Sequence, residues 1–175
     1  MLSVILQALY FMFPAYVANA VPNFLPHFKM GRVLDSPVDM GHKLFGKRIF
    51  GDHKTVKGFV FGTLSGVLVC LSQYYISNIF GYSFYDAVFV GFLLGFGALL
   101  GDSIKSFFKR RIGVKPGGAL PVFDQIDFVV GALLMASIAV DFKTEFVVTI
   151  LIISPIFPVI ANIVAYFMGI KKVWW

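Results

Sequence analysis

Long uncharged apolar runs alternate along the chain with short stretches that carry nearly all of the charged residues. The first run, 2–21, has about 20 residues, the length that a helix needs to cross a hydrocarbon core of roughly 30 Å. The second run, 58–85, is longer than one span requires, and Gly81 with Ser83 predicts a turn that ends the helix near residue 80. Three further runs cover 87–101, 128–140 and 146–170. The pattern therefore predicts five transmembrane helices, at about 2–21, 58–80, 86–108, 124–140 and 145–170.

The basic residues lie mainly in two of the predicted loops, 22–57 and 109–123. Cytoplasmic loops of membrane proteins carry an excess of Lys and Arg, so both loops are predicted to face the cytoplasm. The N-terminus then lies outside, and the C-terminus is cytoplasmic. We expect an all-α, multi-pass integral protein of the cell membrane, a single domain over 1–175 built as a bundle of about five transmembrane helices with two basic cytoplasmic loops.

The composition supports this fold class and excludes several functions. Of the 175 residues, 58% are hydrophobic and only 14% are charged, which is too apolar for a soluble domain of this length. The net charge of +6 does not indicate nucleic-acid binding, because the basic residues flank the predicted spans and form no separate basic face. Cys70 is the single cysteine, which excludes a disulfide framework and a thiolate metal site.

Two of the uncharged runs are too short to span a bilayer by themselves. The run that follows Asp127 has 13 residues, or roughly 20 Å of helix. Extending it backward places Asp127 and Asp124 on one helix face, three positions apart. The run that ends before Asp102 has the same shortage, and its extension aligns Asp102, Ser106 and Lys109 at i, i+4 and i+7. We therefore expect two polar stripes to face each other at the cytoplasmic boundary.

The carboxylates of these stripes suggest a cation site. Acidic residues inside membrane helices are costly and are normally paired, solvated or bound to a cation. Asp102, Asp124 and Asp127 converge without histidine or thiolate company, and oxygen-only ligand sets suit hard cations such as Mg²⁺. The alternative is a set of interfacial salt bridges that fixes loop geometry, the interpretation that we prefer for the acidic residues of the outer loops. A Mg²⁺ ion among basic loop residues predicts a polyphosphate ligand.

The first basic loop combines glycines with cationic side chains and is predicted to clamp phosphate groups. It is not a P-loop, because Asp52 and His53 precede the Lys54–Thr55 pair and the glycine spacing is wrong. The three histidines show no metal-ligand spacing, so zinc is not expected. Asn19 ends the first predicted helix, and its amide either holds the helix terminus by hydrogen bonds or contacts a ligand.

The sequence GDSIKSFFKRRIGVK, followed by a glycine-containing loop and DQID, resembles the signature of the membrane CTP:phosphatidate cytidylyltransferases. The upstream HKTVKG is similar to the KTxxG element of that family. Gln125 departs from the family's Arg, and the family's HGG triplet is absent. With LDSPVDMGHKLFGKRIFGDHKT, the chain resembles the archaeal branch, the CDP-archaeol synthases, over nearly its whole length. The positions that match the signature are Asp102, Ser106, Lys109, Arg110, Gly113, Lys115, Asp124 and Asp127.

This resemblance implies a Mg²⁺-dependent nucleotidyltransferase with its active site facing the cytoplasm. It would move CMP from CTP to unsaturated archaetidic acid, 2,3-bis-O-geranylgeranylglycerol 1-phosphate, and release CDP-archaeol and pyrophosphate. The implied metal ligands are Asp102, Asp124 and Asp127, which act together with Lys109 in catalysis. The implied substrate-binding residues are Asn19, Lys47, Arg48, Lys54, Thr55, Lys57, Ser106, Arg110 and Lys115.

Other functions are open at this point. A CDP-diacylglycerol synthase would use phosphatidate as the acceptor. A CTP-dependent lipid kinase of the polyprenol or phytol type would transfer the γ-phosphoryl group and release CDP. A cation-coupled transporter should distribute polar residues through the membrane depth, whereas the charges here cluster at one face. A structural scaffold would tolerate replacement of the three aspartates.

Overall fold

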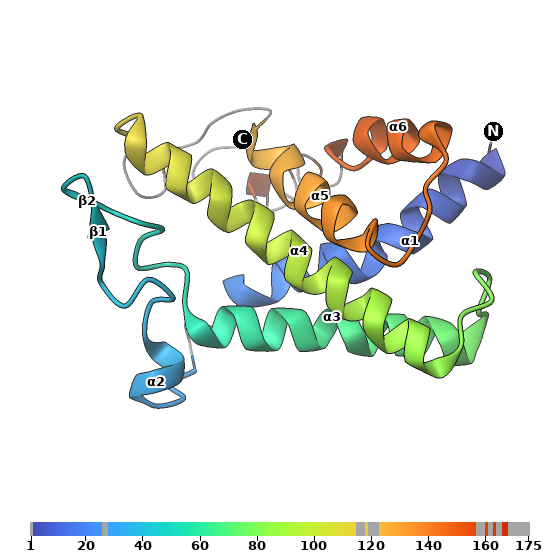
Figure 1. Cartoon of the computed structure of the whole chain (residues 1–175), viewed down its shortest axis with the longest axis horizontal. Helices are drawn as coiled ribbons and strands as arrows, with labels where there is room; N and C mark the ends of the chain where they lie inside the picture. The colour runs from blue at the N-terminus through green and yellow to red at the C-terminus, as the bar shows by residue number, and fades with distance from the viewer. Residues whose placement is uncertain are drawn as a thin grey trace.

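The computed structural model describes residues 2–25, 28–114, 118, 123–156, 160, 163, 166 and 167. Helices predominate (Figure 1). They are α1 (Leu2–Ala20), α2 (Arg32–Asp35), α3 (Val56–Ile76), α4 (Phe84–Arg111), α5 (Phe123–Ala136) and α6 (Thr144–Ile153). A short 3-10 helix, η1 (Val21–Asn23), follows α1. Two short strands, β1 (Lys43–Leu44) and β2 (Lys47–Arg48), lie between α2 and α3.

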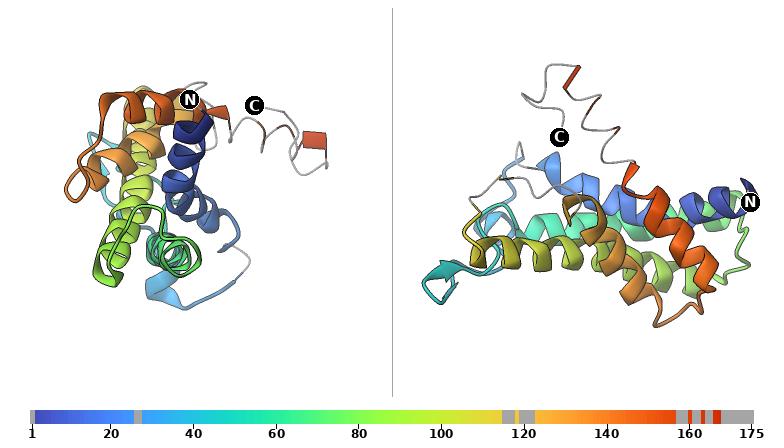
Figure 2. Two further views of the ribbon diagram at one scale, coloured as in Figure 1. Left: turned by 90° about the vertical axis from the view of Figure 1, so that its right-hand side faces the viewer. Right: turned by 90° about the horizontal axis from the view of Figure 1, so that it is seen from above.

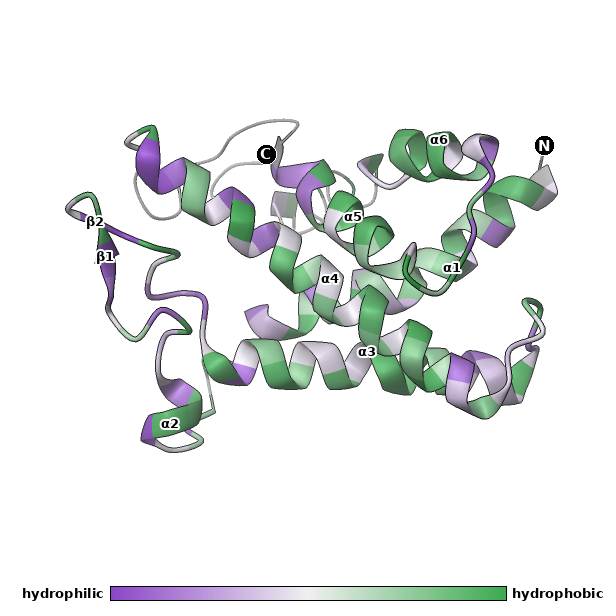
Figure 3. Cartoon of the chain, in the orientation of Figure 1, coloured by the Kyte–Doolittle hydropathy of each residue, from purple (hydrophilic) through white to green (hydrophobic). Residues whose placement is uncertain are grey.

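Within the described part of the chain, three helical segments are long and apolar enough to cross a membrane: Ser3–Asn23, Val56–Ile76 and Phe84–Arg111. The first two have 21 residues and the third has 28, so each reaches the roughly 20 residues that a span requires. α3 and α4 lie side by side in both views of Figure 2. Hydrophilic residues gather around the β hairpin, the end of α4 and the start of α5 (Figure 3). The helix bundle thus has one markedly polar end.

Glycines let α4 and α5 touch backbone to backbone. A Cβ on Gly131 would lie 2.7 Å from the Cα of Gly101, and one on Gly97 would lie 2.6 Å from the carbonyl oxygen of Gly131. Any side chain at these positions would force the helices apart, because its neighbours are rigid backbone. Small residues bring membrane helices close in this way. The contact holds the backbone of Asp127 directly against Gly101 and so brings an acidic residue of α5 against α4.

Apolar side chains close the opposite part of the bundle. Phe11 on α1 makes edge contacts with the rings of Phe80, Phe142 and Phe146, at centroid distances of 5.6, 5.3 and 5.7 Å. Aromatic pairs prefer this geometry to face-to-face stacking. The segments that follow α3 and α5 are therefore packed onto α1, away from the polar end.

The first basic loop contains structure that the sequence pattern did not predict, so the expectation of an all-α chain is wrong in this detail. β1 and β2 pair antiparallel, with Lys43 opposite Arg48. Phe45 and Gly46 between them both have positive φ, 52° and 76°. A two-residue type I′ turn requires positive φ at both central positions. Phenylalanine rarely adopts that conformation, so the sequence did not predict a turn at this position.

Two helices end earlier than the apolar runs predicted, and a third is interrupted. α3 ends at Ile76 instead of 80, and Asn78 with a φ of 33° begins the following connection. α5 ends at Ala136 instead of 140. The last predicted helix, 145–170, is interrupted: α6 ends at Ile153, because Pro155 lacks a backbone N–H and its ring clashes with the preceding turn, and the described residues at 156, 160, 163, 166 and 167 are helical again. Most of the remainder of that predicted helix lies outside the described residues.

Replacing Gly131 by Val should push α5 away from α4 and destabilise the bundle. The added side chain meets the Gly101 backbone, so we expect the free energy of unfolding to fall by about 1–3 kcal/mol. Thermal unfolding of the purified protein in detergent measures the change. Leu134→Val on the same helix is the matched control, since Leu134 is 68% exposed. Equal effects of the two substitutions would contradict the importance of the backbone contact.

Candidate active site

Three carboxylates from two helices converge on one ammonium group. Lys105 Nζ on α4 lies 3.1 Å from Oδ1 of Asp102 on the same helix. On α5, Asp124 Oδ1 lies 3.2 Å and Asp127 Oδ2 lies 2.8 Å from the same nitrogen. We call the three aspartates together with Lys105 the carboxylate cluster. The helical repeat produces it, since residues three apart share one face of a helix.

Two further lysines border the cluster. Lys109, one turn beyond Lys105, places its Nζ 2.7 and 2.9 Å from the two carboxylate oxygens of Asp124. Lys54 comes from the first basic loop and forms an ion pair with Asp102. Three carboxylates are thus matched by three ammonium groups. Such matching is required where charges are largely removed from water, because an unpaired buried charge is strongly destabilising.

Asp127 is the most deeply placed of the three acids, with a side chain that is 8% exposed. Among the described residues, neither of its carboxylate oxygens accepts a hydrogen bond of ordinary geometry, although Lys105 pairs with one of them. Buried polar oxygens nearly always have hydrogen-bond partners. The Oδ1 atom of Asp127 therefore has the capacity to take a ligand that the described residues do not supply.

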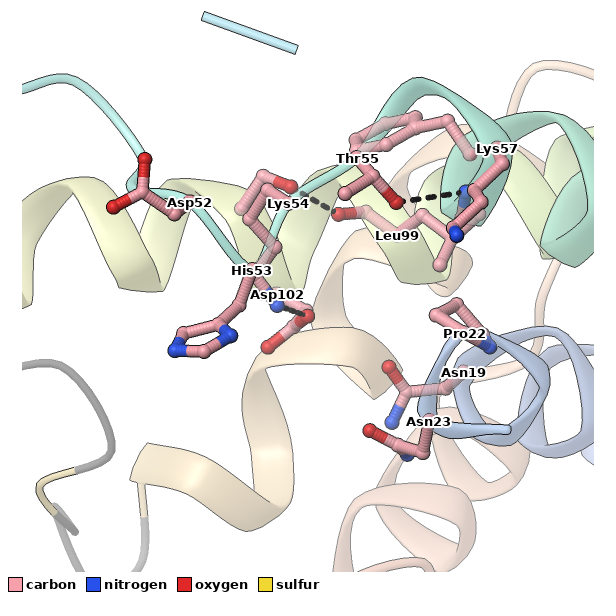
Figure 4. Close-up of a pocket in the computed structure, with 13 residues that line it drawn as sticks. Asn19, Pro22, Asn23, Asp52, His53, Lys54, Thr55, Lys57, Leu99 and Asp102 are labelled. Carbon is pink, nitrogen blue, oxygen red and sulfur yellow. Dashed lines mark hydrogen bonds and ion pairs between the residues drawn. The ribbon is translucent and has the colours of Figure 1, made fainter. Parts of the chain in front are cut away.

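A cavity of about 400 Å³ opens beside the cluster (Figure 4). Its volume is within the range of small-molecule sites, roughly 300–1,000 Å³. The walls come from the end of α1 with η1, the first basic loop, the start of α3 and the middle of α4. The lining residues are Asn19, Pro22, Asn23, Asp52, His53, Lys54, Thr55, Lys57, Gly58, Phe59, Leu99, Asp102 and Ser103.

The cavity is polar on one side and apolar on the other. Asp102 and Lys54 belong both to its wall and to the network of paired charges. In Figure 4 the amides of Asn19 and Asn23 face the space that separates them from Asp102. Leu99 adds an apolar surface from α4. A ligand with a charged group and a long apolar part matches this division.

Asp39 organises the first basic loop. Its side chain is fully buried and accepts hydrogen bonds from Arg48 Nη2 at 2.5 Å and from the backbone N–H groups of Gly41, Phe50 and Gly51 at 3.2, 2.9 and 3.1 Å. Burial alone would raise the pKa of Asp39. The hydrogen bonds from Arg48 and the backbone outweigh burial and hold that pKa below its ordinary value. Asp39 is therefore ionised whenever the loop is folded at neutral pH.

Two hydrogen bonds tie the hairpin to the end of α4. Lys47 Nζ donates to the carbonyl of Arg111 at 3.0 Å, and Arg111 Nη1 donates to the carbonyl of Arg48 at 2.8 Å. The Arg111 guanidinium also lies over the ring of Phe107, 3.9 Å from its centroid. In this structure Lys47 and Arg48, which the resemblance implies as substrate-binding residues, have partners within the protein that hold the loop in place, and their contact with substrate stays a prediction.

Lys57 and Thr55 have structural partners at the start of α3. Lys57 Nζ donates to Asp35 Oδ1 at 2.7 Å and to the carbonyl of Phe28 at 2.8 Å. Thr55 Oγ1 accepts from the N–H of Gly58 at 3.2 Å, as an N-cap residue does. Both residues still line the cavity, so they shape its wall while their polar groups are engaged.

The remaining predicted residues are less closely connected to the cavity. The Ser106 hydroxyl donates a hydrogen bond to the backbone carbonyl of Asp102 at 2.9 Å, as serine side chains within helices often do. Arg110 follows Lys109 on α4 and is not among the residues that line the cavity. Lys115 lies outside the described residues.

Lys105 is a site residue that the sequence pattern did not identify. The predicted polar stripe joins Asp102 to the residues four and seven positions later, whereas the lysine three positions later shares the same helix face. Asn23 and His53 were also absent from the predicted site, yet both line the cavity. Only the fold brings the end of α1 to α4, so spacing along the chain gave no signal for Asn23.

The described residues contain no group of three or more His, Cys, Asp or Glu side chains already arranged to hold a metal ion. Lys105 takes the position that the three carboxylates share. The donor set nevertheless fits a hard divalent cation, since it consists of carboxylate oxygens from three residues and includes the unbonded Asp127 Oδ1.

Comparison with known proteins gives matches along the whole chain. A family model described as "CarS-like: CDP-archaeol synthase" matches residues 1–175. A CDP-archaeol synthase of Methanococcus maripaludis (strain C7) is 39% identical over 183 aligned residues, covering 100% of this chain and 99% of its own. That of Methanocaldococcus jannaschii is 39% identical and covers 96% of each chain. A solved structure, described as that of an intramembrane enzyme for archaeal membrane lipids biosynthesis, has a TM-score of 0.69 at 34% identity and covers 91% of this chain and 94% of its own.

Asp39→Asn should loosen the first basic loop. The change removes a buried charge that holds Arg48, so we expect the free energy of unfolding to fall by about 1.5–3 kcal/mol at pH 7. Limited trypsin cleavage within the hairpin, together with thermal unfolding, measures the effect. Asp52→Asn is the matched control, because Asp52 also pairs with Arg48 but its side chain is 75% exposed.

The stability contributed by Asp39 should depend on pH in the acid range. Because the pKa of Asp39 is lower in the folded than in the unfolded protein, its contribution is complete above the unfolded value of about 3.9 and is lost as the pH falls below that value. The unfolding temperature of Asp39→Asn should therefore approach that of the wild type as the pH drops below about 4. A constant difference from pH 7 to pH 3 would contradict this assignment.

Proposed function

The chain belongs to the CDP-archaeol synthase family of nucleotidyltransferases in archaeal membrane lipid biosynthesis, and on this premise we propose that the carboxylate cluster and the adjoining cavity form its catalytic site. It is accordingly a multi-pass integral membrane enzyme. The observation that carries the proposal is the position of Asp102 and Lys54, which belong both to the paired charges and to the cavity wall. A substrate in the cavity would meet the charges there.

We infer that CTP is the nucleotide donor and that unsaturated archaetidic acid, 2,3-bis-O-geranylgeranylglycerol 1-phosphate, is the acceptor. An oxygen of the lipid phosphate attacks the α-phosphorus of CTP. The bond from the α-phosphorus to the oxygen that bridges it to the β-phosphorus breaks, and pyrophosphate leaves with that oxygen. A phosphate monoester has a second pKa of about 6, so the acceptor is already largely dianionic at neutral pH and needs no strong general base.

Mg²⁺ is the cofactor that we propose, held by Asp102, Asp124 and Asp127. The support is the donor chemistry of the cluster and the unbonded oxygen of Asp127. When bound, Mg²⁺ neutralises charge on the phosphate oxygens and orients them. The carboxylates themselves bind no anionic substrate, so the lysines around them must supply the remaining positive charge.

The cationic side chains have separate places around the cluster. Lys54 lies at the boundary with the cavity, where its ammonium would contact a phosphate of either substrate. Lys109, at the side of Asp124 toward the end of α4, is proposed to stabilise the departing pyrophosphate. Arg110 and Lys115 follow it in the sequence and are proposed to assist. Positioning and charge neutralisation are the main contributions in phosphoryl transfer of this kind.

The lipid is proposed to enter with its apolar part along the wall formed by Phe59 and Leu99. Asn19 and Asn23 offer amide donors and acceptors to the polar part of a substrate on the facing wall. The two basic loops support a site that opens toward the cytoplasm, where CTP is present. The N-terminus would then lie on the outer face and the C-terminus in the cytoplasm.

Asp102→Asn and Asp124→Asn should each reduce lipid-dependent release of pyrophosphate from CTP by at least about a hundred-fold, because each removes a charge from the proposed metal site. The assay uses purified protein, Mg²⁺ and geranylgeranylated glycerol phosphate. Asp141→Asn, in the exposed segment before α6, is the control expected to retain activity. EDTA should abolish the wild-type reaction.

The identity of the product tests the direction of transfer. Cytidylyl transfer yields pyrophosphate and a CDP-lipid, whereas γ-phosphoryl transfer would yield CDP and a phosphorylated lipid. Formation of CDP, or full activity in either aspartate variant, would overturn the proposed mechanism. Activity with phosphatidate at the same rate would contradict the proposed preference for the isoprenoid acceptor.

A further inference from the structure

The contacts of Lys105 differ from those of the other lysines around the site. Its ammonium lies within 3.2 Å of an oxygen of each of the three aspartates. Lys54 and Lys109, by contrast, each pair with a single carboxylate among the described residues. Lys105 therefore occupies the point that all three carboxylates share. None of the roles described above for nucleotide or lipid binding uses it.

Three ionised carboxylates do not remain this close in a largely buried site without a cation between them. Like charges repel strongly where water is scarce, so the arrangement needs positive charge at its centre. Lys105 supplies that charge, but it does not satisfy every carboxylate oxygen. Oδ1 of Asp127 is buried and accepts no hydrogen bond of ordinary geometry from the described residues. The arrangement is thus suited to a cation with more coordination positions than one ammonium provides.

We propose that Lys105 is an internal counter-ion that holds the three aspartates together before a divalent cation binds, and that its ammonium leaves the centre when the cation enters. This inference rests on the proposed Mg²⁺ site. A lysine ammonium stands on a flexible four-carbon stem, so it can move without any change in the backbone. The glycine contact between α4 and α5 keeps the carboxylates in place during the exchange.

Lys105 is a positioning residue in this scheme, and it sets the apparent affinity of the site. A cation binds only when the ammonium is displaced, so the apparent dissociation constant rises in inverse proportion to the fraction of molecules in which the centre is open. The same lysine stabilises the metal-free protein. Its removal should therefore have two opposite effects: weaker folding without metal and tighter metal binding.

The first test is binding of Mn²⁺, as a spectroscopic substitute for Mg²⁺, to the purified protein in detergent. If the centre is open in about one molecule in ten, Lys105→Met should lower the dissociation constant for Mn²⁺ about ten-fold. Lys109→Met is the matched control, since Lys109 lies one turn further along the same helix but pairs with Asp124 alone. Its effect should be clearly smaller. Unchanged or weaker binding of Mn²⁺ to Lys105→Met would overturn the inference.

The second test needs no metal. In EDTA, Lys105→Met should unfold roughly 5 °C below the wild type, because three carboxylates then repel one another. Adding Asp127→Asn to this variant removes one of the negative charges and should restore most of the loss, whereas Asp127→Asn in the wild-type background should not stabilise the protein. If the second substitution fails to rescue the first, Lys105 does not act as the counter-ion of the cluster.

Failure of the metal site and failure of this inference give different results. If neither the wild type nor any variant binds Mn²⁺, the proposed metal site fails, and displacement of Lys105 fails with it. If the wild type binds Mn²⁺ and Asp127→Asn abolishes binding, the metal site stands. Lys105→Met with an unchanged dissociation constant would in that case refute the role of Lys105 alone.

Discussion

Three carboxylates repel one another at the polar end of this apolar helix bundle, and both the helix packing and the fold of the first basic loop serve to balance that repulsion. Two lysines of α4, Lys105 and Lys109, and one lysine of the first basic loop, Lys54, hold the three aspartates together. Neither helix nor loop could keep these charges in place alone, because unpaired charges in a poorly hydrated site are strongly destabilising. The helix pair and the first basic loop are therefore two halves of one site.

Several cationic side chains of the first basic loop stabilise the fold of the loop itself. Asp39 holds Arg48, and Asp35 holds Lys57, so these cations are neutralised before any substrate arrives. Lys54 differs from them, since its partner is a carboxylate of the cluster on another element. A cation whose partner belongs to the site is well placed to exchange that partner for a phosphate. The immobilised cations around it fix where that exchange takes place.

The length of the apolar runs predicted the essential placement of the acids. Two runs too short for a bilayer had to be extended into polar residues, and this reasoning put Asp102 on one helix and Asp124 with Asp127 on another. The same reasoning did not identify Lys105, because a lysine beside a loop is equally compatible with an ordinary membrane-flanking position. Periodicity defines the face of a helix, and only packing decides which residues on that face meet a neighbour.

Contacts between residues far apart in the chain could not be predicted from the sequence pattern. The engagement of Lys47 with Arg111 depends on a hairpin whose turn places Phe45 in a conformation that phenylalanine rarely adopts. The cavity depends on the end of α1 reaching α4, which no spacing along the chain encodes. The resemblance to a known family predicted the reaction. The individual contacts of the loop cations could be identified only from the three-dimensional arrangement.

The glycine contact between α4 and α5 also bears on how such an enzyme can adapt to different membranes. Because backbone meets backbone there, the spacing of the acidic side chains is set without help from the bulky residues that face lipid. Residues such as Leu64 and Leu68, which lie exposed on α3, can then change with bilayer thickness or temperature while the catalytic spacing stays the same. In this arrangement the lipid-facing surface can therefore change in evolution independently of the spacing of the acidic side chains.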